Sequence, residues 1–161
     1  MNDGMKNDLL DAALVHVPFD GWNEAMVIAA AQDVGATSDQ VAALFPRGAI
    51  DMAAAFHKRG DHLMLDRLDS ADLATMRYSE RVAAAVRFRL EVVENKDVVR
   101  RGSALFSLPQ HAPEGAQLIW GTADQIWLAL GDTSDDINWY SKRAILSGVY
   151  ASSVLFWLGD N

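Results

Sequence analysis

The chain has 161 residues, of which 50% are hydrophobic and 22% charged, so it carries enough apolar mass for the core of one or two small domains. It contains no cysteine, which excludes disulfide bonds and cysteine-bound metal and favours a reducing compartment. Its formal net charge of -8 disfavours nucleic-acid binding, because an acidic surface repels a phosphate backbone unless basic residues gather on one face.

Helical periodicity runs through the first 45 residues and predicts three short helices. Apolar side chains recur every three or four positions over residues 10–17, and Pro18 is expected to end this first helix. The second helix is expected to end at Gly35, a residue suited to a left-handed C-terminal cap. Thr37 and Gln40 have the spacing of a capping box, which starts a third helix.

Five further helices are predicted in the rest of the chain. The first is expected to start near Gly48, the second to cover residues 82–93 and the third to end at Pro109. The fourth is expected from Pro113 to Gly131, and the fifth from about Asp136 to Leu158. The polar stretch 65–77 fits either a helix end or a loop. Because no alternating strand pattern is present, the sequence predicts an all-α protein with a three-helix unit at 1–47 and a helical bundle at 48–161.

The three-helix unit resembles the helix-turn-helix of TetR-type regulators, through the pattern at residues 30–37 and 45–48. A recognition helix normally presents Arg, Lys, Asn or Gln to base edges, with basic neighbours on phosphates. The expected third helix, Ser38–Leu44, holds one acid and no base, and no lysine or arginine lies between Lys6 and Arg47. The unit is therefore interpreted as a retained scaffold, and a TetR-type regulator that senses a hydrophobic ligand is the alternative function.

Metal-binding and catalytic patterns are weak. His57 and Asp61 are four residues apart, but no third ligand is visible. The acidic segment 132–138 has oxygen ligands at the odd positions of a calcium loop, yet Ile137 occupies the glycine position and Arg143 the glutamate position. Since no nucleophile, base and oxyanion set is recognisable, we expect neither a metal site nor an enzyme.

Aromatic residues and the last predicted helix are more informative. Residues 144–158 are apolar on nearly every side, so this helix is expected to be surrounded, either by core or by a cavity for an apolar ligand. The uncharged stretch ends at residue 159, which makes it shorter than the roughly 20 residues of a membrane span. Small residues over 147–153 leave room beside the backbone for a lipid. The predicted lipid-binding residues are Trp120, Ile145, Val149, Ser152 and Phe156.

The segment from Asp124 to Ala144 resembles the ninth Coq protein family, lipid-binding accessory proteins of ubiquinone (coenzyme Q) biosynthesis. The resemblance rests on Asp124, Trp127, the Gly131-Asp132 pair and the block 138–144, which reads Asn-Trp-Tyr-Ser-Lys-Arg-Ala. It extends from about Leu9 to Leu158, with further matches at residues 12–22 and 108–109.

The resemblance implies a TetR-regulator fold used for lipid binding rather than transcription. It implies a lipid or isoprenoid ligand, without any other cofactor, and delivery of a quinone precursor to the membrane-associated di-iron hydroxylase of the pathway, the seventh Coq protein. The family surface for that hydroxylase maps here to Asp124, Ile126, Trp127, Trp139, Tyr140 and Arg143. We expect Trp139, Tyr140 and Arg143 to be exposed, as in a protein-binding hot spot.

Two departures set expectations about location. The family usually continues into a C-terminal amphipathic helix that contacts membranes, whereas this chain stops at Asn161. The first eight residues show no secretory or transit signal. We therefore expect a bacterial protein in the cytoplasm beside the inner membrane, with eukaryotic relatives at the matrix side of the mitochondrial inner membrane, and a homodimer, as is common for this fold.

Overall fold

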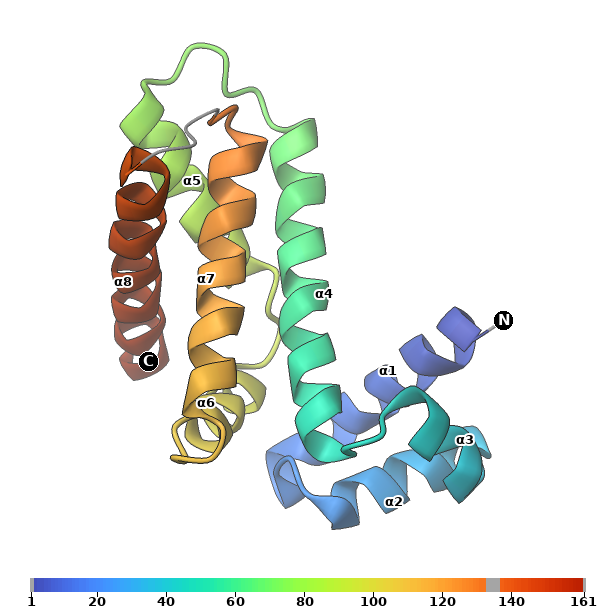
Figure 1. Cartoon of the computed structure of the whole chain (residues 1–161). Helices are drawn as coiled ribbons and strands as arrows, with labels where there is room; N and C mark the ends of the chain where they lie inside the picture. Colours follow the sequence, from blue (N-terminus) through green and yellow to red (C-terminus); the bar gives the residue numbers. More distant parts are fainter. Residues whose placement is uncertain (1, 133–136, 161) are drawn as a thin grey trace. The chain divides into compact units, whose positions relative to one another are not determined.

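The computed structural model describes residues 2–132 and 137–160, and within them every regular element is an α-helix (Figure 1). The helices are α1 (Asn2–Asp20), α2 (Glu24–Val34), α3 (Ser38–Leu44), α4 (Ala49–Ser70), α5 (Tyr78–Glu91), α6 (Lys96–Phe106), α7 (Ala112–Ala129) and α8 (Ile137–Gly159). The predicted all-α fold is confirmed. A TetR-like arrangement is compatible with these helices and stays a prediction.

The chain divides into two compact units. Unit 1 comprises residues 1–57 and 95–112, and unit 2 comprises residues 58–94 and 113–161. These units follow spatial contacts, so α6 joins the N-terminal helices although it lies far from them in sequence. The predicted sequence domains, 1–47 and 48–161, stay a prediction.

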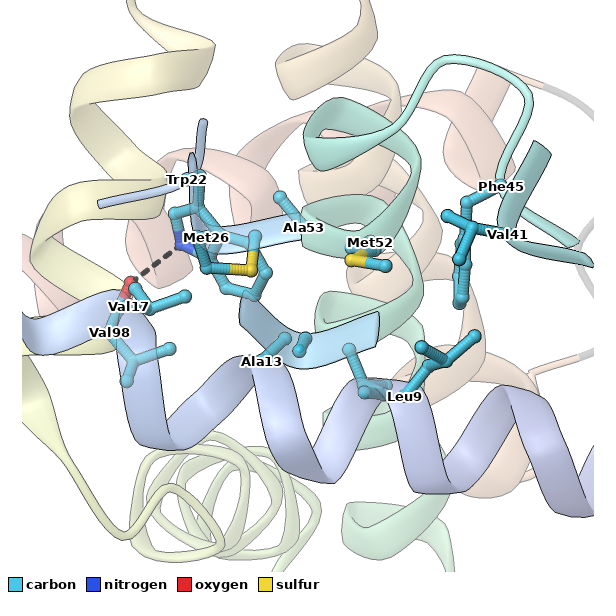
Figure 2. Packing of buried hydrophobic residues seen from close by; sticks show 12 residues of the cluster. Leu9, Ala13, Val17, Trp22, Met26, Val41, Phe45, Met52, Ala53 and Val98 are labelled. Carbon is cyan, nitrogen blue, oxygen red and sulfur yellow. Dashed lines mark hydrogen bonds between the residues drawn. The ribbon is translucent and has the colours of Figure 1, made fainter. Parts of the chain in front are cut away.

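Unit 1 is built on the apolar faces of α1, α2 and the start of α4 (Figure 2). Leu9, Ala13 and Val17, spaced four residues apart on α1, are fully buried. Trp22 closes the core and donates a hydrogen bond from its indole Nε1 to the carbonyl of Val98 on α6, at 3.2 Å. This bond satisfies the one polar atom of a buried tryptophan and fastens α6 to the N-terminal helices.

The first helix does not end at Pro18, so that prediction is wrong. α1 continues to Asp20, and the amide of Gly21 donates to the carbonyl of Val17 at 2.8 Å. A proline lacks one N–H donor, but three residues from the helix end it costs a single bond, while the burial of Val17 holds the last turn in place.

The predicted helix signals at α2 and α3 are confirmed. Gly35 caps α2 in the left-handed conformation, with φ of 71°. At α3 the amide of Gln40 donates to the hydroxyl of Thr37 at 3.1 Å, and the amide of Thr37 donates to the Gln40 side chain at 2.8 Å. These local bonds place the short α3 helix directly after the turn.

Unit 2 packs α5, α7 and α8 beside the C-terminal half of α4 (Figure 1). Its core consists of Met64, Leu68, Ala85, Val86, Ala123, Ile126, Leu146 and Tyr150. For the stretch 65–77 the sequence allowed either a helix end or a loop, and the structure has both. α4 runs to Ser70, and the next helix starts at Tyr78. Over the described ranges, no helix has the combination of length and apolarity that crossing a bilayer requires.

The expectation that the last helix is surrounded is wrong. Ile145, Val149, Leu155 and Phe156 on α8 are exposed, whereas Leu146 and Tyr150 are buried. α8 therefore has an inner face in the core and an outer apolar face in solvent. Sequence periodicity missed this division because nearly every position of the helix is apolar or small.

Candidate functional site

An open groove of about 760 Å³ follows the outer face of α8 where this helix packs on the end of α5. Its lining residues are Leu90 of α5 and, from α8 and the residue after it, Ile145, Gly148, Val149, Ser152, Ser153, Phe156, Trp157 and Asp160. The volume lies within the range of small-molecule sites, and the walls are mainly apolar with a few hydroxyl groups. The groove is open to solvent rather than an enclosed cavity.

Small residues create this groove. Nothing lies within 4 Å of the position that a Cβ atom on Gly148 would take. Ser152 follows one helical turn later, so two small side chains leave a channel between Val149 and Phe156. Phe156 is 79% exposed, and together with the exposed Val149 and Ile145 it forms an apolar surface along the groove. The groove thus offers an apolar guest a surface that water covers poorly.

Four of the five residues predicted to bind lipid, Ile145, Val149, Ser152 and Phe156, line the groove. Trp120 is not among its lining residues and lies on α7 instead. Their role as ligand contacts stays a prediction. The sequence reasoning missed Leu90, which belongs to another helix, and the terminal residues Trp157 and Asp160, which continue the same helical face and were open to prediction from their spacing.

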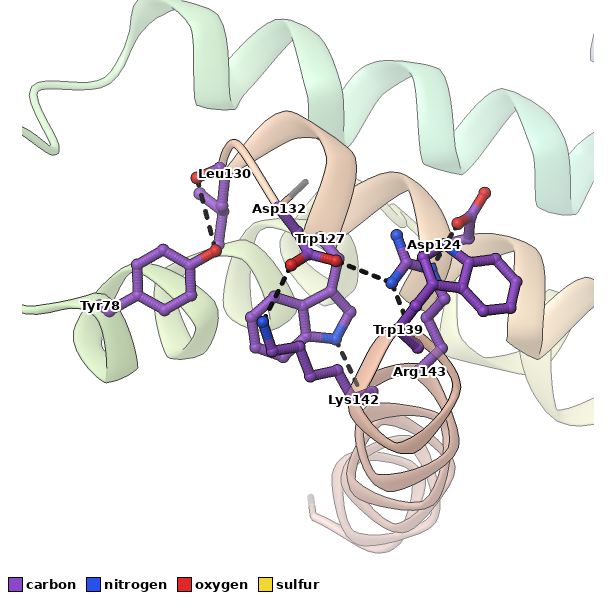
Figure 3. A network of polar contacts seen from close by, with 8 residues as sticks. All are labelled: Tyr78, Asp124, Trp127, Leu130, Asp132, Trp139, Lys142 and Arg143. Carbon is purple, nitrogen blue, oxygen red and sulfur yellow. Dashed lines mark hydrogen bonds and ion pairs between the residues drawn. The ribbon is translucent and has the colours of Figure 1, made fainter. Parts of the chain in front are cut away.

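A second cluster lies at the corner where α7 ends and α8 begins, which we call the α7–α8 corner (Figure 3). Asp132, whose side chain is buried, accepts bonds from Lys142 Nζ and from Arg143 Nη1, both at 2.9 Å. Arg143 Nε donates to Asp124 at 2.6 Å. Two cations and two carboxylates are therefore balanced, as a buried charged cluster requires.

Trp127 fastens the two helices from the other side of the corner. Its indole Nε1 donates to the carbonyl of Lys142 at 3.0 Å, and its ring stacks on Tyr78 of α5, with centroids 5.6 Å apart and planes at 24° (Figure 3). The ammonium of Lys142 lies 5.4 Å from the centroid of the Trp127 ring. Trp127 thus contacts both α5 and α8.

Three aromatic side chains gather at the outer side of the corner, and we call them the aromatic trio: Trp120, Trp139 and Tyr140. The Trp120 ring lies 6.0 Å from that of Trp139 and 5.0 Å from that of Tyr140, both tilted. Trp120 and Trp139 are half-buried, and Tyr140 is 58% exposed. The structure therefore places Trp120, predicted to bind lipid, with two residues predicted to bind a protein partner.

Two of the predicted partner-binding residues are fully buried, and Trp139, which was expected to be exposed, is half-buried. Arg143 is fully buried beneath the trio, and Ile126 is fully buried in the core of unit 2. Ile126 lies on the inner face of α7, while Asp124 and Trp127 are half-buried at the corner. The expectation that Arg143 is exposed is wrong, because the carboxylates of Asp124 and Asp132 draw its guanidinium inward.

Burial alone would lower the pKa of the Arg143 guanidinium, since a low dielectric disfavours the charged form. The hydrogen bonds and charges of Asp124 and Asp132 outweigh burial, and the pKa is raised above its ordinary value. Arg143 is therefore a permanent cation inside the corner.

The other candidate sites acquire structural roles. Asp61, considered as a metal ligand with His57, accepts bonds from Arg89 and Thr122. Residues 133–136, which hold Ser134 and Asp136 of the calcium-like pattern, lie outside the described residues. In the turn after α3, Arg47 is paired with Asp51 at 2.7 Å, which offsets its positive charge.

Comparison with known proteins shows similarity to COQ9 proteins. The COQ9 family model matches residues 112–161, the segment that holds α7 and α8. The chain is 31% identical over 163 residues to the mitochondrial ubiquinone biosynthesis protein COQ9 of Drosophila melanogaster, covering 98% of this chain and 50% of the relative. It is 30% identical over 160 residues to COQ9 of Schizosaccharomyces pombe, covering 98% and 62%.

A rat COQ9 protein is 28% identical over 166 residues, covering 98% of this chain and 53% of the relative. The chain thus spans about half the length of the curated relatives it matches. The groove and the α7–α8 corner both draw on the segment that the family model matches. The resemblance expected from the sequence is confirmed: this chain is similar along nearly its whole length to the COQ9 proteins, which are named for ubiquinone biosynthesis.

Proposed function

We propose that the chain is a lipid-binding accessory protein of ubiquinone biosynthesis. In this proposal it holds a hydrophobic quinone precursor in the α8 groove and presents it to the membrane-associated di-iron hydroxylase of the pathway. It performs no reaction with its own side chains. The observation that carries the proposal is the groove of about 760 Å³, with Phe156 and Val149 exposed beside the open space at Gly148.

The chemistry of the groove suits an isoprenoid. Apolar walls from Leu90, Ile145 and Val149 match a hydrocarbon chain, and burying each square ångström of apolar surface contributes about 25 cal/mol. Ser152 and Asp160 supply polar contacts for a hydroxylated ring. The names of the relatives point to the same pathway, since each is called a ubiquinone biosynthesis protein.

The aromatic trio supports the second half of the proposal. Binding hot spots are rich in tryptophan and tyrosine, and half-buried rings lose little conformational freedom when a partner docks. The trio and the groove share α8, so a guest and a docked hydroxylase would contact the same helix. We therefore propose the trio, with Asp124 and Trp127 beside it, as the surface that receives the hydroxylase.

Native mass spectrometry tests the lipid half. The purified chain should carry a co-purified isoprenoid or phospholipid, and should bind an added ubiquinone with two isoprene units. Gly148→Leu should fill the groove and abolish both signals, because Gly148 has open space beside it and no unusual backbone angle.

Gly121→Leu is the matched control, since Gly121 also lies within a long helix with nothing within 4 Å of its Cβ position, yet does not line the groove. This variant should keep the bound lipid. A wild-type spectrum without lipid and without uptake of the added quinone would contradict the proposal, as would retention of lipid by Gly148→Leu.

Two further features remain proposals. We infer that the chain forms a homodimer, which sedimentation equilibrium at several protein concentrations tests directly.

We also infer a location peripheral to a membrane, in line with the mitochondrial relatives and with the exposed Leu155 and Phe156. Flotation with vesicles of mixed zwitterionic and anionic lipids tests this location, and a protein that stays at the bottom of the gradient would contradict it.

A further inference from the structure

Arg143 lies directly under Trp139. Its Cζ atom is 4.4 Å from the centroid of the indole ring, a close cation–π contact. Its Nη1 atom also donates to the carbonyl of Trp139 at 3.1 Å. The same guanidinium therefore fixes both the backbone and the ring of Trp139 (Figure 3).

The guanidinium itself is anchored from α7 and from the segment after it. Asp124 binds Nε at 2.6 Å, and Asp132 binds Nη1 at 2.9 Å. Because both anchors lie on the preceding helix and its end, the position of Trp139 relative to α7 depends on Arg143. Trp120, the α7 member of the aromatic trio, lies 6.0 Å from Trp139 across this junction.

Stability alone does not explain an arginine at this place. A buried ion cluster is weak evidence for stability, because an apolar side chain of similar volume often stabilises such a site as well or better. What an apolar side chain cannot supply is the fixed fork that ties Asp124, Asp132 and the Trp139 ring together.

We propose that Arg143 is a positioning residue of the hydroxylase-docking surface. Its guanidinium holds the Trp139 indole in place within the aromatic trio and does not touch the partner itself. The inference rests on the proposed function, because it assigns a role within the docking surface. It also reassigns Arg143, since a fully buried side chain supplies no contact area to a partner.

Fluorine NMR of protein labelled with 5-fluorotryptophan tests the positioning without any partner. Five tryptophans give five resonances, assigned by single Trp→Phe variants. In Arg143→Met the resonances of Trp139 and Trp120 should shift or broaden, while those of Trp22 and Trp157 should stay unchanged. An unchanged Trp139 resonance in the folded variant would overturn the proposal.

Lys142→Met is the matched control. Lys142 neighbours Arg143, shares Asp132 with it and lies over Trp127 rather than Trp139. This variant should move the Trp127 resonance and leave that of Trp139 in place. If Arg143→Met does not fold, Asp124→Ala replaces it, because Asp124 is one third exposed and its loss removes one anchor of the guanidinium. The Trp139 resonance should then shift as well, and an unchanged one counts against the proposal.

A double-mutant cycle with the purified hydroxylase gives the second measurement. Arg143→Met should weaken binding about tenfold, and should weaken it no further in a Trp139→Ala background, because Arg143 acts through Trp139. An equal loss in both backgrounds would show a direct contact and overturn the proposal. If Trp139→Ala itself leaves hydroxylase binding intact, the docking function fails, while the fluorine spectra still decide whether Arg143 positions the indole.

Discussion

The guanidinium of Arg89 occupies the place where a side chain on Gly60 would begin: the Cβ position built on Gly60 lies 2.5 Å from Arg89 Cζ. Arg89 enters this place from α5 and donates from Nε to Asp61 on α4 at 2.8 Å. Both side chains are almost fully buried, and Thr122 of α7 donates to the same carboxylate oxygen at 2.7 Å. Three helices of unit 2 therefore meet at one buried ion pair.

Gly60→Ala should destabilise the protein, although alanine usually favours a helix. The added methyl group must displace a guanidinium that its bonds to Asp61 hold in place, and disrupting a buried ion pair costs about 3–5 kcal/mol. Gly121→Ala, with open space around it, should instead gain roughly 0.5–1 kcal/mol. Urea unfolding of both variants measures the difference, and a stabilised Gly60→Ala would show that Arg89 moves aside freely.

The ion pair itself makes a second prediction. Asp61→Leu and Arg89→Met should each lower the free energy of unfolding by about 3–5 kcal/mol, because each removes one partner of a buried ion pair. The double variant should recover most of this loss, since it removes the ion pair as a whole, and Thr122 keeps the carbonyl of Leu118 as an acceptor. Strictly additive losses in the double variant would mean that the two side chains are not energetically coupled.

The burial of Tyr150 predicts that the stability of the protein falls at alkaline pH. Burial raises the pKa of its phenol above the ordinary value, the nearby charge of Arg89 opposes the shift, and that of Asp61 adds to it. Above pH of about 10 the unfolded chain loses this proton while the folded protein keeps it, so stability falls by up to about 1.4 kcal/mol per pH unit until the folded pKa is reached.

Tyr150→Phe isolates this contribution from the other groups that titrate in the same range. The stability difference between wild type and variant should shift in favour of the variant between pH 8 and pH 11, measured by urea unfolding at both pH values. A difference that is the same at both would contradict the raised pKa.

Substitutions at Ile126 and Tyr140 should distinguish an effect on stability from an effect on hydroxylase binding. Ile126→Ala should cost about 2–5 kcal/mol of stability, because it opens a cavity in the core of unit 2. Tyr140→Ala should change stability by less than about 0.5 kcal/mol, yet weaken hydroxylase binding about tenfold. Thermal unfolding and titration calorimetry provide the two readings. A large loss of stability in Tyr140→Ala would show that Tyr140 stabilises the fold and is not part of the docking surface.

Sequence reasoning succeeded where the cause is local. The cap at Gly35 and the capping box of Thr37 and Gln40 depend on residues four positions apart or closer, and the structure has both. The prediction that the first helix ends at Pro18 failed because a proline near a helix end removes only one hydrogen bond. The burial of Val17 in the core offsets that loss.

The candidate site was less predictable, because it depends on contacts between helices. The pair of Asp61 and Arg89 is 28 positions apart in sequence, and no spacing rule links them. The COQ9 resemblance marks Arg143 and Ile126 but does not tell which side of its helix each one faces. Sequence reasoning did not place Trp120 beside Trp139 and Tyr140 for the same reason: these neighbours reach it only after α8 folds back along α7.

Arg89 and Leu90 are consecutive residues with opposite tasks. One reaches inward to the carboxylate shared by three helices, and the next forms the α5 wall of the groove. The buried bond between Arg89 and Asp61 therefore fixes the position of the α5 wall, so a guest in the groove meets a rigid side at Leu90.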